Sequence, residues 1–318
     1  MESNRRNVWI VVAFVLVAAC CLVVVLGAVL ASRFLGFPFG WSTTTDVQGA
    51  PLERAFEVGG SPRLEVDNFA GSLIVREGST GEIWVRAIKH ARRAGDLDRI
   101  QVQMSERDGR VEIKTRKPPV LGNAWVELEI VAPADTDLHL NTGSGSVEVS
   151  GVGEGAEVST GSGSVTVRGL RGEIDLHSGS GSVTARDLEG RLKASTGSGR
   201  IVIEDMTGET DAHTGSGSID VRRASGVVKL DTGSGSIEYQ GSPRGDCRFE
   251  TGSGSIDLRL PADLGAEVDL HTGSGSIEVG FAVVGQISKR DVEGMIGRGG
   301  DVSIYAHTGS GGIDLIRD

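Results

Sequence analysis

The five letters TGSGS recur through the second half of the chain and constrain its fold more than any other feature. The first five steps between copies are 18 residues each, and the next three are 19, 21 and 36 residues. A fixed period of this size is typical of proteins that stack one small unit many times. The copies, including slightly altered ones, begin at Thr142, Thr160, Ser178, Thr196, Thr214, Thr232, Thr251, Thr272 and Thr308.

Alternating apolar and polar residues flank each copy. Leu138 and Leu140 precede the copy at Thr142, and Val147 and Val149 follow it. A period of two indicates a strand with one buried face. Each unit is therefore predicted to be a strand, a glycine corner, a second strand and a second turn.

One such unit has only about five inward side chains, too few to fold alone, so the units must stack at ~4.8 Å. We predict an all-β fold, a single-stranded parallel β-helix (β-solenoid) with coils of ~18 residues. Corners that stack this closely need glycine, which predicts a structural role for the nine corner residues above. A phosphate-binding loop would need a GKS or GKT ending and a following helix, and the calcium-binding repeat would need an Asp at the corner.

The stretch before the regular repeats shows weakened versions of the same pattern. Asn68 and Glu106 stand where Thr stands in later units, and their spacing to Thr142 predicts about two coils for each step. We therefore expect one continuous solenoid over residues 56–318, irregular over 56–137 and regular over 138–318. The charged segment 90–99 (HARRAGDLDR) is expected to protrude as a loop or short helix.

The N-terminal segment carries an uncharged run at residues 8–31, long enough to cross a bilayer as a helix. Arginines precede and follow it, which favours a cytoplasmic N-terminus at residues 1–7 and an exported remainder. Residues 32–55 are interpreted as a linker. A cleaved leader is the alternative, with lipidation at Cys20, although the run stays apolar well beyond that residue.

Outward-facing charges on successive units form the main candidate for a binding surface. Acidic residues are expected one coil apart in a column, about 4.8 Å from one another, with two arginines beside them. The pattern fits a solvated charge ladder; a weak cation or glycan contact is the alternative, and catalysis a remote one. The predicted surface ladder consists of Asp220, Arg222, Glu238, Asp257, Arg259 and Glu278.

Four histidines stand just before corner residues. His177 and His213 are expected two coils apart, too far to share a zinc ion. His271 and His307 become neighbours only if residues 281–300 loop out instead of forming a coil. Cys247 is expected to be a small core residue. We predict no catalytic residue, no cofactor and no metal site.

The runs WVELEIVAPADTDLHLNTGSGSVEV (125–149) and LEVDNFAGSLIV (64–75), with the repeated GSGSI corners, resemble a bacterial family of "putative adhesins", the domain of unknown function 4097. They are also similar to the adhesin head domains of auto-transporters. The resemblance covers about residues 56–318. It implies a right-handed parallel β-helix that is often displayed from a membrane anchor, and it brings no catalytic residue with it.

A net charge of −11 without a basic stripe argues against a nucleic-acid partner. The pattern favours a membrane-anchored, extracytoplasmic structural or adhesin-like module that binds an envelope glycan or protein. One alternative is an envelope-stress regulator or scaffold that binds a protein partner. The other is a cytoplasmic scaffold that self-associates, because no cap is evident at the last repeat and an uncovered solenoid end is a template for pairing. An enzyme acting on polysaccharide is disfavoured.

Overall fold

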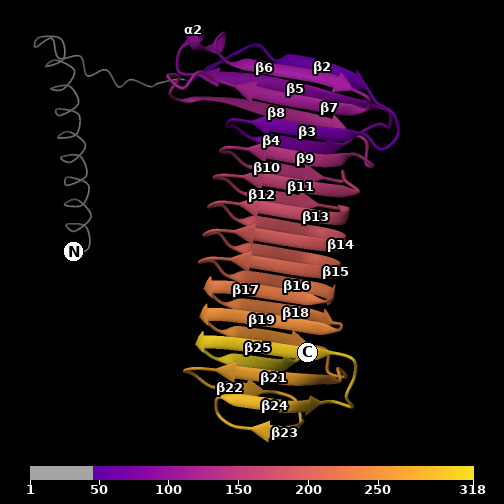
Figure 1. Ribbon diagram of the computed structural model, residues 1–318, viewed down its shortest axis with the longest axis vertical. Coiled ribbons are helices and arrows are strands. Elements are labelled where there is room, and N and C mark those ends of the chain that lie inside the picture. Colours follow the sequence, from indigo (N-terminus) through magenta and orange to yellow (C-terminus); the bar gives the residue numbers. More distant parts are fainter. Residues whose placement is uncertain (1–45) are drawn as a thin grey trace, which may run out of the picture. The chain divides into compact units, whose positions relative to one another are not determined.

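The computed structural model describes residues 46–318, which form one elongated stack of β-strands (Figure 1). The predicted membrane helix at 8–31 lies outside the described residues, as does most of the predicted linker. Among residues 46–318, no helix is long and apolar enough to span a bilayer.

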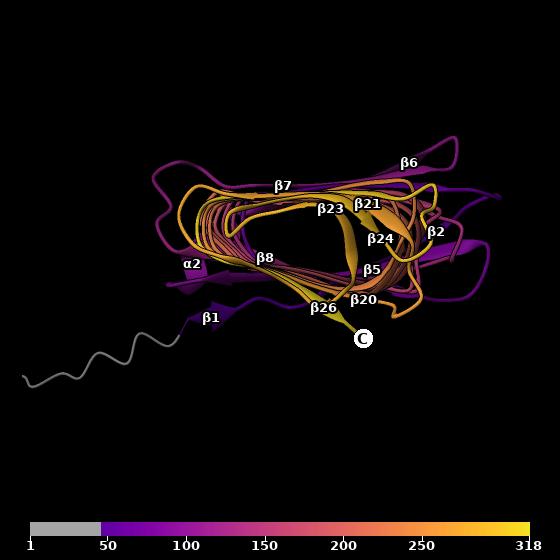
Figure 2. The same cartoon turned by 90° about the horizontal axis from the view of Figure 1, so that it is seen from below.

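Each regular coil is flattened, and its two strands form opposite long sides of the stack (Figure 2). Strands on one side pair in parallel with those of the next coil, residue for residue; Val147 lies beside Val165, 18 residues later. The fold is therefore all-β with largely parallel strands, as expected for a β-solenoid. The handedness of the coil stays a prediction.

The side that we call face A includes the strands that follow the corners. In spatial order it contains β1 (Val47–Gln48) and β2 (Leu52–Glu57), β5 (Glu82–Ala91), β8 (Ala124–Ala132), β4 (Leu73–Glu77), β10 (Val147–Ser150), β12 (Val165–Arg168), the first parts of β14 (Val183–Thr196) and β15 (Ile201–Thr214), β16 (Ile219–Gly226), β18 (Ile237–Pro243), β20 (Ile256–Leu260), β26 (Ile313–Arg317) and β22 (Ile277–Val279).

The opposite side, face B, includes the strands that lead into the corners. In spatial order it contains β6 (Gln101–Arg107), β7 (Arg110–Arg116), β3 (Arg63–Asn68), β9 (Asp137–Thr142), β11 (Gly155–Thr160), β13 (Arg171–Ser178), the second parts of β14 and β15, β17 (Val228–Ser234), β19 (Asp246–Ser253), β25 (Ser303–Ser310), β21 (Ala266–Thr272), β24 (Asp291–Ile296) and β23 (Val283–Ile287).

The inward residues of both faces form one continuous hydrophobic core of mostly Val, Ile and Leu. Tyr239 and Phe249 are its largest fully buried side chains, with ring centroids 5.3 Å apart. The Tyr239 hydroxyl donates a hydrogen bond to the carbonyl oxygen of Ala224, which satisfies its one buried polar group. Cys247 is buried in this core, as predicted.

The end of the stack that holds β1, β2, β5 and β6, here called the proximal end, departs from the predicted order. The coil of β3 and β4 lies between the coil of β9 and β10 and that of β7 and β8. Asn68 is thus one coil from Thr142, not two, and Glu106 lies on an antiparallel strand, not at a corner. The prediction of two coils for each step was wrong because strands reverse direction here.

Antiparallel strands close the proximal end. β5 pairs with β8 and carries β1 and β2 on its other edge, while β6 folds back on β7. The charged segment 90–99 contains the short helix α2 (Ala94–Leu97), so the prediction of a loop or short helix there is confirmed.

The opposite, distal end also breaks chain order. The coil of β25 and β26 lies between that of β19 and β20 and that of β21 and β22, which comes earlier in the chain. Residues 281–300 form neither a coil nor a plain loop, because β23 and β24 make an antiparallel hairpin that continues face B beyond β21. The chain crosses the end of the coil close to this hairpin (Figure 2). The expectation of a last repeat without a cap was therefore wrong.

Candidate functional site

The nine corner residues form an unbroken buried column on face B. They lie in register in the order of the coils, with Thr308 placed between Thr251 and Thr272. All nine hydroxyls donate to a glycine carbonyl of a neighbouring corner, as from Thr196 to Gly181 at 2.8 Å. These bonds satisfy polar groups that the tight stacking buries.

The corner glycines are needed for close approach between coils. A Cβ atom built on Gly181 would overlap the carbonyl oxygen of Gly163 in the preceding coil, and the same holds one coil further for Gly199. The overlapped atom is backbone, which cannot turn aside as a side chain can. The glycines are therefore required by the close stacking of the corners. The hydroxyl groups that form hydrogen bonds here are mainly those of the corner Thr residues, not those of the Ser residues between the glycines.

The predicted surface ladder lies on the outer side of face A. Asp220, Glu238 and Asp257 occupy three consecutive coils in exact register. Arg259 donates to Glu238 at 2.6 Å, and Arg222 lies 3.8 Å from the same carboxylate. In this part of the ladder, two of the three half-buried acids, Asp220 and Glu238, form ion pairs with arginines.

The ladder continues differently from the predicted order. Asp314 lies directly beside Asp257, and Glu278 comes one coil later beside Asp314. Glu278 is therefore not the neighbour of Asp257, because the coil of β25 and β26 separates them. Burial, followed by the nearby Asp314 carboxylate, raises the pKa of the Asp257 carboxyl group above its ordinary value, and Arg259 opposes this only in part.

Face B carries the four histidines that stand just before corner residues. His177 and His213 are two coils apart, with Ser195 between them. His271 and His307 are neighbours, with stacked rings whose centroids are 5.1 Å apart, and His271 also contacts Asp291 of β24. No group of three or more His, Cys, Asp or Glu side chains within residues 46–318 is arranged to hold a metal ion.

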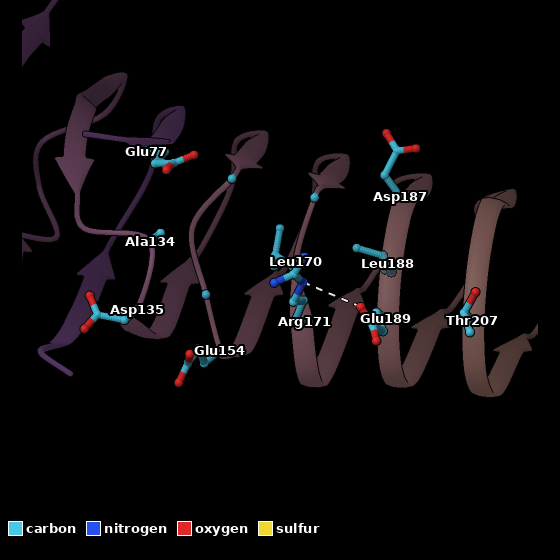
Figure 3. Close-up of a pocket in the computed structure, with 13 residues that line it drawn as sticks. Glu77, Ala134, Asp135, Glu154, Leu170, Arg171, Asp187, Leu188, Glu189 and Thr207 are labelled. Atoms are coloured by element: carbon cyan, nitrogen blue, oxygen red, sulfur yellow. Dashed lines mark ion pairs between the residues drawn. The ribbon is translucent and has the colours of Figure 1, made fainter. Parts of the chain in front are cut away.

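A groove of about 800 Å³ lies along the second turns of several coils near the proximal end (Figure 3). Glycines and two buried leucines form its floor, and Arg171 and Glu189, 3.6 Å apart, form an ion pair on its wall. The carboxylates that line it are those of Glu77, Asp135, Glu154, Asp187 and Glu189.

Sequence reasoning missed this groove, Asp314 and the corner role of Thr115. Thr115 is buried beside Asn68, donates to its side-chain oxygen at 2.6 Å and accepts a bond from the amide of Phe69. Nothing in the spacing marks it, because the segment after Thr115 (residues 116–123) has no GSGS. The position of Asp314 had two available signs in the sequence. One is the spacing of 36 residues between Thr272 and Thr308, and the other is the alternation of apolar and polar residues between these two corners.

The fold and surface define a class: a stacked β-coil protein with buried Thr–Gly corners, polar columns on both faces and antiparallel strands at both ends. Within this class, residues 62–315 match the family described as Toastrack DUF4097. The chain belongs to that family, as the resemblance found in the sequence implied.

Solved structures that resemble this chain are distant. They are a "putative cell adhesion protein" from Clostridium sporogenes (13% identity, TM-score 0.23, covering 85% of this chain and 100% of that one), a "putative adhesin" from Bacteroides fragilis (13%, 0.39, 84% and 97%) and a "putative lipid binding protein" from Parabacteroides distasonis (12%, 0.30, 85% and 97%). Identity and TM-score are low in all three, so these likenesses carry no argument about function. No curated protein matches the chain.

Proposed function

We propose that this protein is a membrane-anchored, extracytoplasmic binding and structural module of the bacterial cell envelope, without enzymatic activity. The observation that carries the proposal is the register of the outer columns, which places the same kind of polar side chain on consecutive coils. Repeated weak contacts along such a column add through multivalency, which suits an extended glycan or protein surface.

A binding assay tests the proposal. The full-length chain in lipid nanodiscs is incubated with isolated cell-wall sacculi, and the retained fraction is measured for wild type and for the double variant Asp220→Asn/Glu238→Gln. We expect the variant to bind about tenfold more weakly, because two consecutive contacts are lost. The matched control is Asp211→Asn, an exposed acid on face B.

Two results would contradict the proposed binding role. One is equal retention of the wild type and the double variant. The other is a wild-type chain that does not bind sacculi but captures a single membrane protein, which would favour the regulatory scaffold. Cleavage of acidic polysaccharide that is lost in Asp257→Asn would contradict the absence of catalysis.

Topology needs its own experiment. A cysteine placed at Asp96 in α2, which lies in the protruding charged segment, is labelled in intact cells with a membrane-impermeant thiol reagent. We expect labelling without cell lysis. Labelling only after lysis would favour a cytoplasmic scaffold.

A further inference from the structure

The outer strand of the distal hairpin, β23, has an open edge. It pairs with β24 on one side, and no other strand among residues 46–318 is paired with it. Backbone donors and acceptors along such an edge are a template for another strand. The hairpin covers the core at this end, but the outer edge of β23 remains available for pairing with another strand.

Exposed apolar side chains gather at the same place. Val284 is 77% exposed and Ile287 is 64% exposed, both on β23, and Met295 opposite Val284 is 37% exposed. The distal hairpin thus holds three of the six exposed large hydrophobic side chains of the described residues. Such a concentration at one end marks a contact surface rather than scattered exposure.

The edges at the proximal end are protected in a way that β23 is not. β2 has the sequence LERAFE and β6 has QVQMSER, so each places charged side chains along its strand. β23 has the sequence VVGQI, with no charge and no proline. Charges on edge strands prevent unwanted pairing, and β23 lacks the charges that β2 and β6 carry.

The sequence of β23 suits pairing with itself. In an antiparallel pair with a two-fold axis at Gly285, Ile287 lies opposite Val283 of the second copy, and the same contact occurs twice. Val283 and Ile287 project from the same face of the strand, and two apolar β-branched residues stabilise a cross-strand pair. Because the strand has no charge, no like charges meet, and the two-fold arrangement closes after two chains.

We propose that two copies of this chain associate end to end through β23. The edge is only five residues long, about 17 Å at ~3.4 Å per residue, so the contact is smaller than a standard interface and reversible. The proposal goes beyond the envelope function proposed above and does not depend on it.

Sedimentation of the full chain in detergent, over about a hundredfold range of concentration, tests the association. We expect the wild-type mass to rise toward two chains. Val284→Lys/Ile287→Lys should raise the dimer dissociation constant at least about tenfold, because a lysine in place of Ile287 removes the apolar partner of Val283, and the two lysines in place of Val284 become diagonal neighbours of like charge. Val120→Lys is the matched control, since Val120 is 79% exposed at a site outside the distal hairpin. It should dimerise as wild type does.

Cross-linking locates the contact. In a Cys20→Ser/Cys21→Ser background, Gln286→Cys should form a covalent dimer with a short bis-maleimide, whereas Gln103→Cys on the charged proximal edge β6 should not. A wild-type chain that stays monomeric throughout, a lysine variant that dimerises equally, or cross-linking at Gln103 alone would overturn the proposal. Capture of an unrelated peptide by β23 in a monomeric chain would do the same.

Discussion

The two ends of the stack interrupt the repeat in different ways. At the proximal end, β5, β2 and β1 extend face A, β6 extends face B, and both of these edges carry charges. At the distal end, a single hairpin whose outer strand β23 is uncharged follows β21, and the out-of-order coil of β25 and β26 lies on the other side of β21. The comparison shows that covering the end of a core and protecting an edge from pairing are separate tasks, and that the distal end performs chiefly the first.

The largest expected effect concerns the inserted coil. Leu315→Ala should lower the free energy of unfolding by about 3 kcal/mol, because it leaves a cavity between two coils. Hydrogen exchange should show lost protection in β21 and β24, with β5 and β8 unchanged. The neighbouring Ile316→Ala, at an exposed position, should change stability by less than about 0.5 kcal/mol. Equal loss of protection at both ends would show that the ends are not independent.

A smaller effect separates the two kinds of corner. Thr308 makes one hydroxyl hydrogen bond, to the carbonyl oxygen of Gly254, whereas Thr115 takes part in two with Asn68 and Phe69. We expect Thr308→Val to cost about 1 kcal/mol and Thr115→Val about 2 kcal/mol, measured by urea unfolding. Thr308→Ser should keep most of the stability. Equal losses for the two valine variants would contradict the difference between the corners.

The smallest effect depends on pH. The pKa of Asp257 is raised in the folded chain, so between the unfolded and folded pKa values the folded chain binds more protons. The stabilisation from this group is present below the unfolded pKa and is lost as pH rises through the folded pKa. Asp257→Asn should therefore stabilise the chain at neutral pH, by about 0.5 kcal/mol after allowance for solvent screening.

The control for this prediction is Asp220→Asn, because Asp220 lies in the same column but is paired with Arg200 at 3.2 Å. It should leave stability unchanged or lower it slightly. The gain from Asp257→Asn should shrink as pH falls, as chemical denaturation at several pH values can measure. A gain that is constant with pH would mean that the ionisation of Asp257 is not the cause.

How far the sequence predicts this fold depends on whether chain order equals spatial order. From Thr142 to Thr251 it does, and the 18- and 19-residue steps place every strand and corner correctly. The 36-residue step from Thr272 to Thr308 is compatible with two arrangements. The chain could form two coils in succession, or it could form a hairpin and then a coil that lies before the coil of Thr272. Spacing alone therefore could not place Asp314. Alternation in VVGQI and DVEGMI about Lys289 and Arg290 was the available sign of a hairpin.

The proximal end could be predicted less well. Thr115 lies 27 residues before Thr142, which is not a multiple of the period, and its corner has lost the glycine–serine signature. β5 and β6 run antiparallel to β8 and β7. Their direction depends on which strand edges are available for pairing in the folded chain, and the local alternation of apolar and polar residues does not reveal this. The family resemblance covered this region without settling its strand order.

The position of the coil of β25 and β26 has a consequence for biosynthesis. β21 and β22 leave the ribosome before residues 303–317 are made. In the folded chain, however, residues 303–317 lie between these strands and β19 and β20, so the position next to β19 and β20 must stay open until they arrive. The coils after about residue 260 therefore cannot be added one after another in the order of translation. A nascent chain stalled before residue 303 should be cut by proteases after about residue 260 while its earlier turns resist.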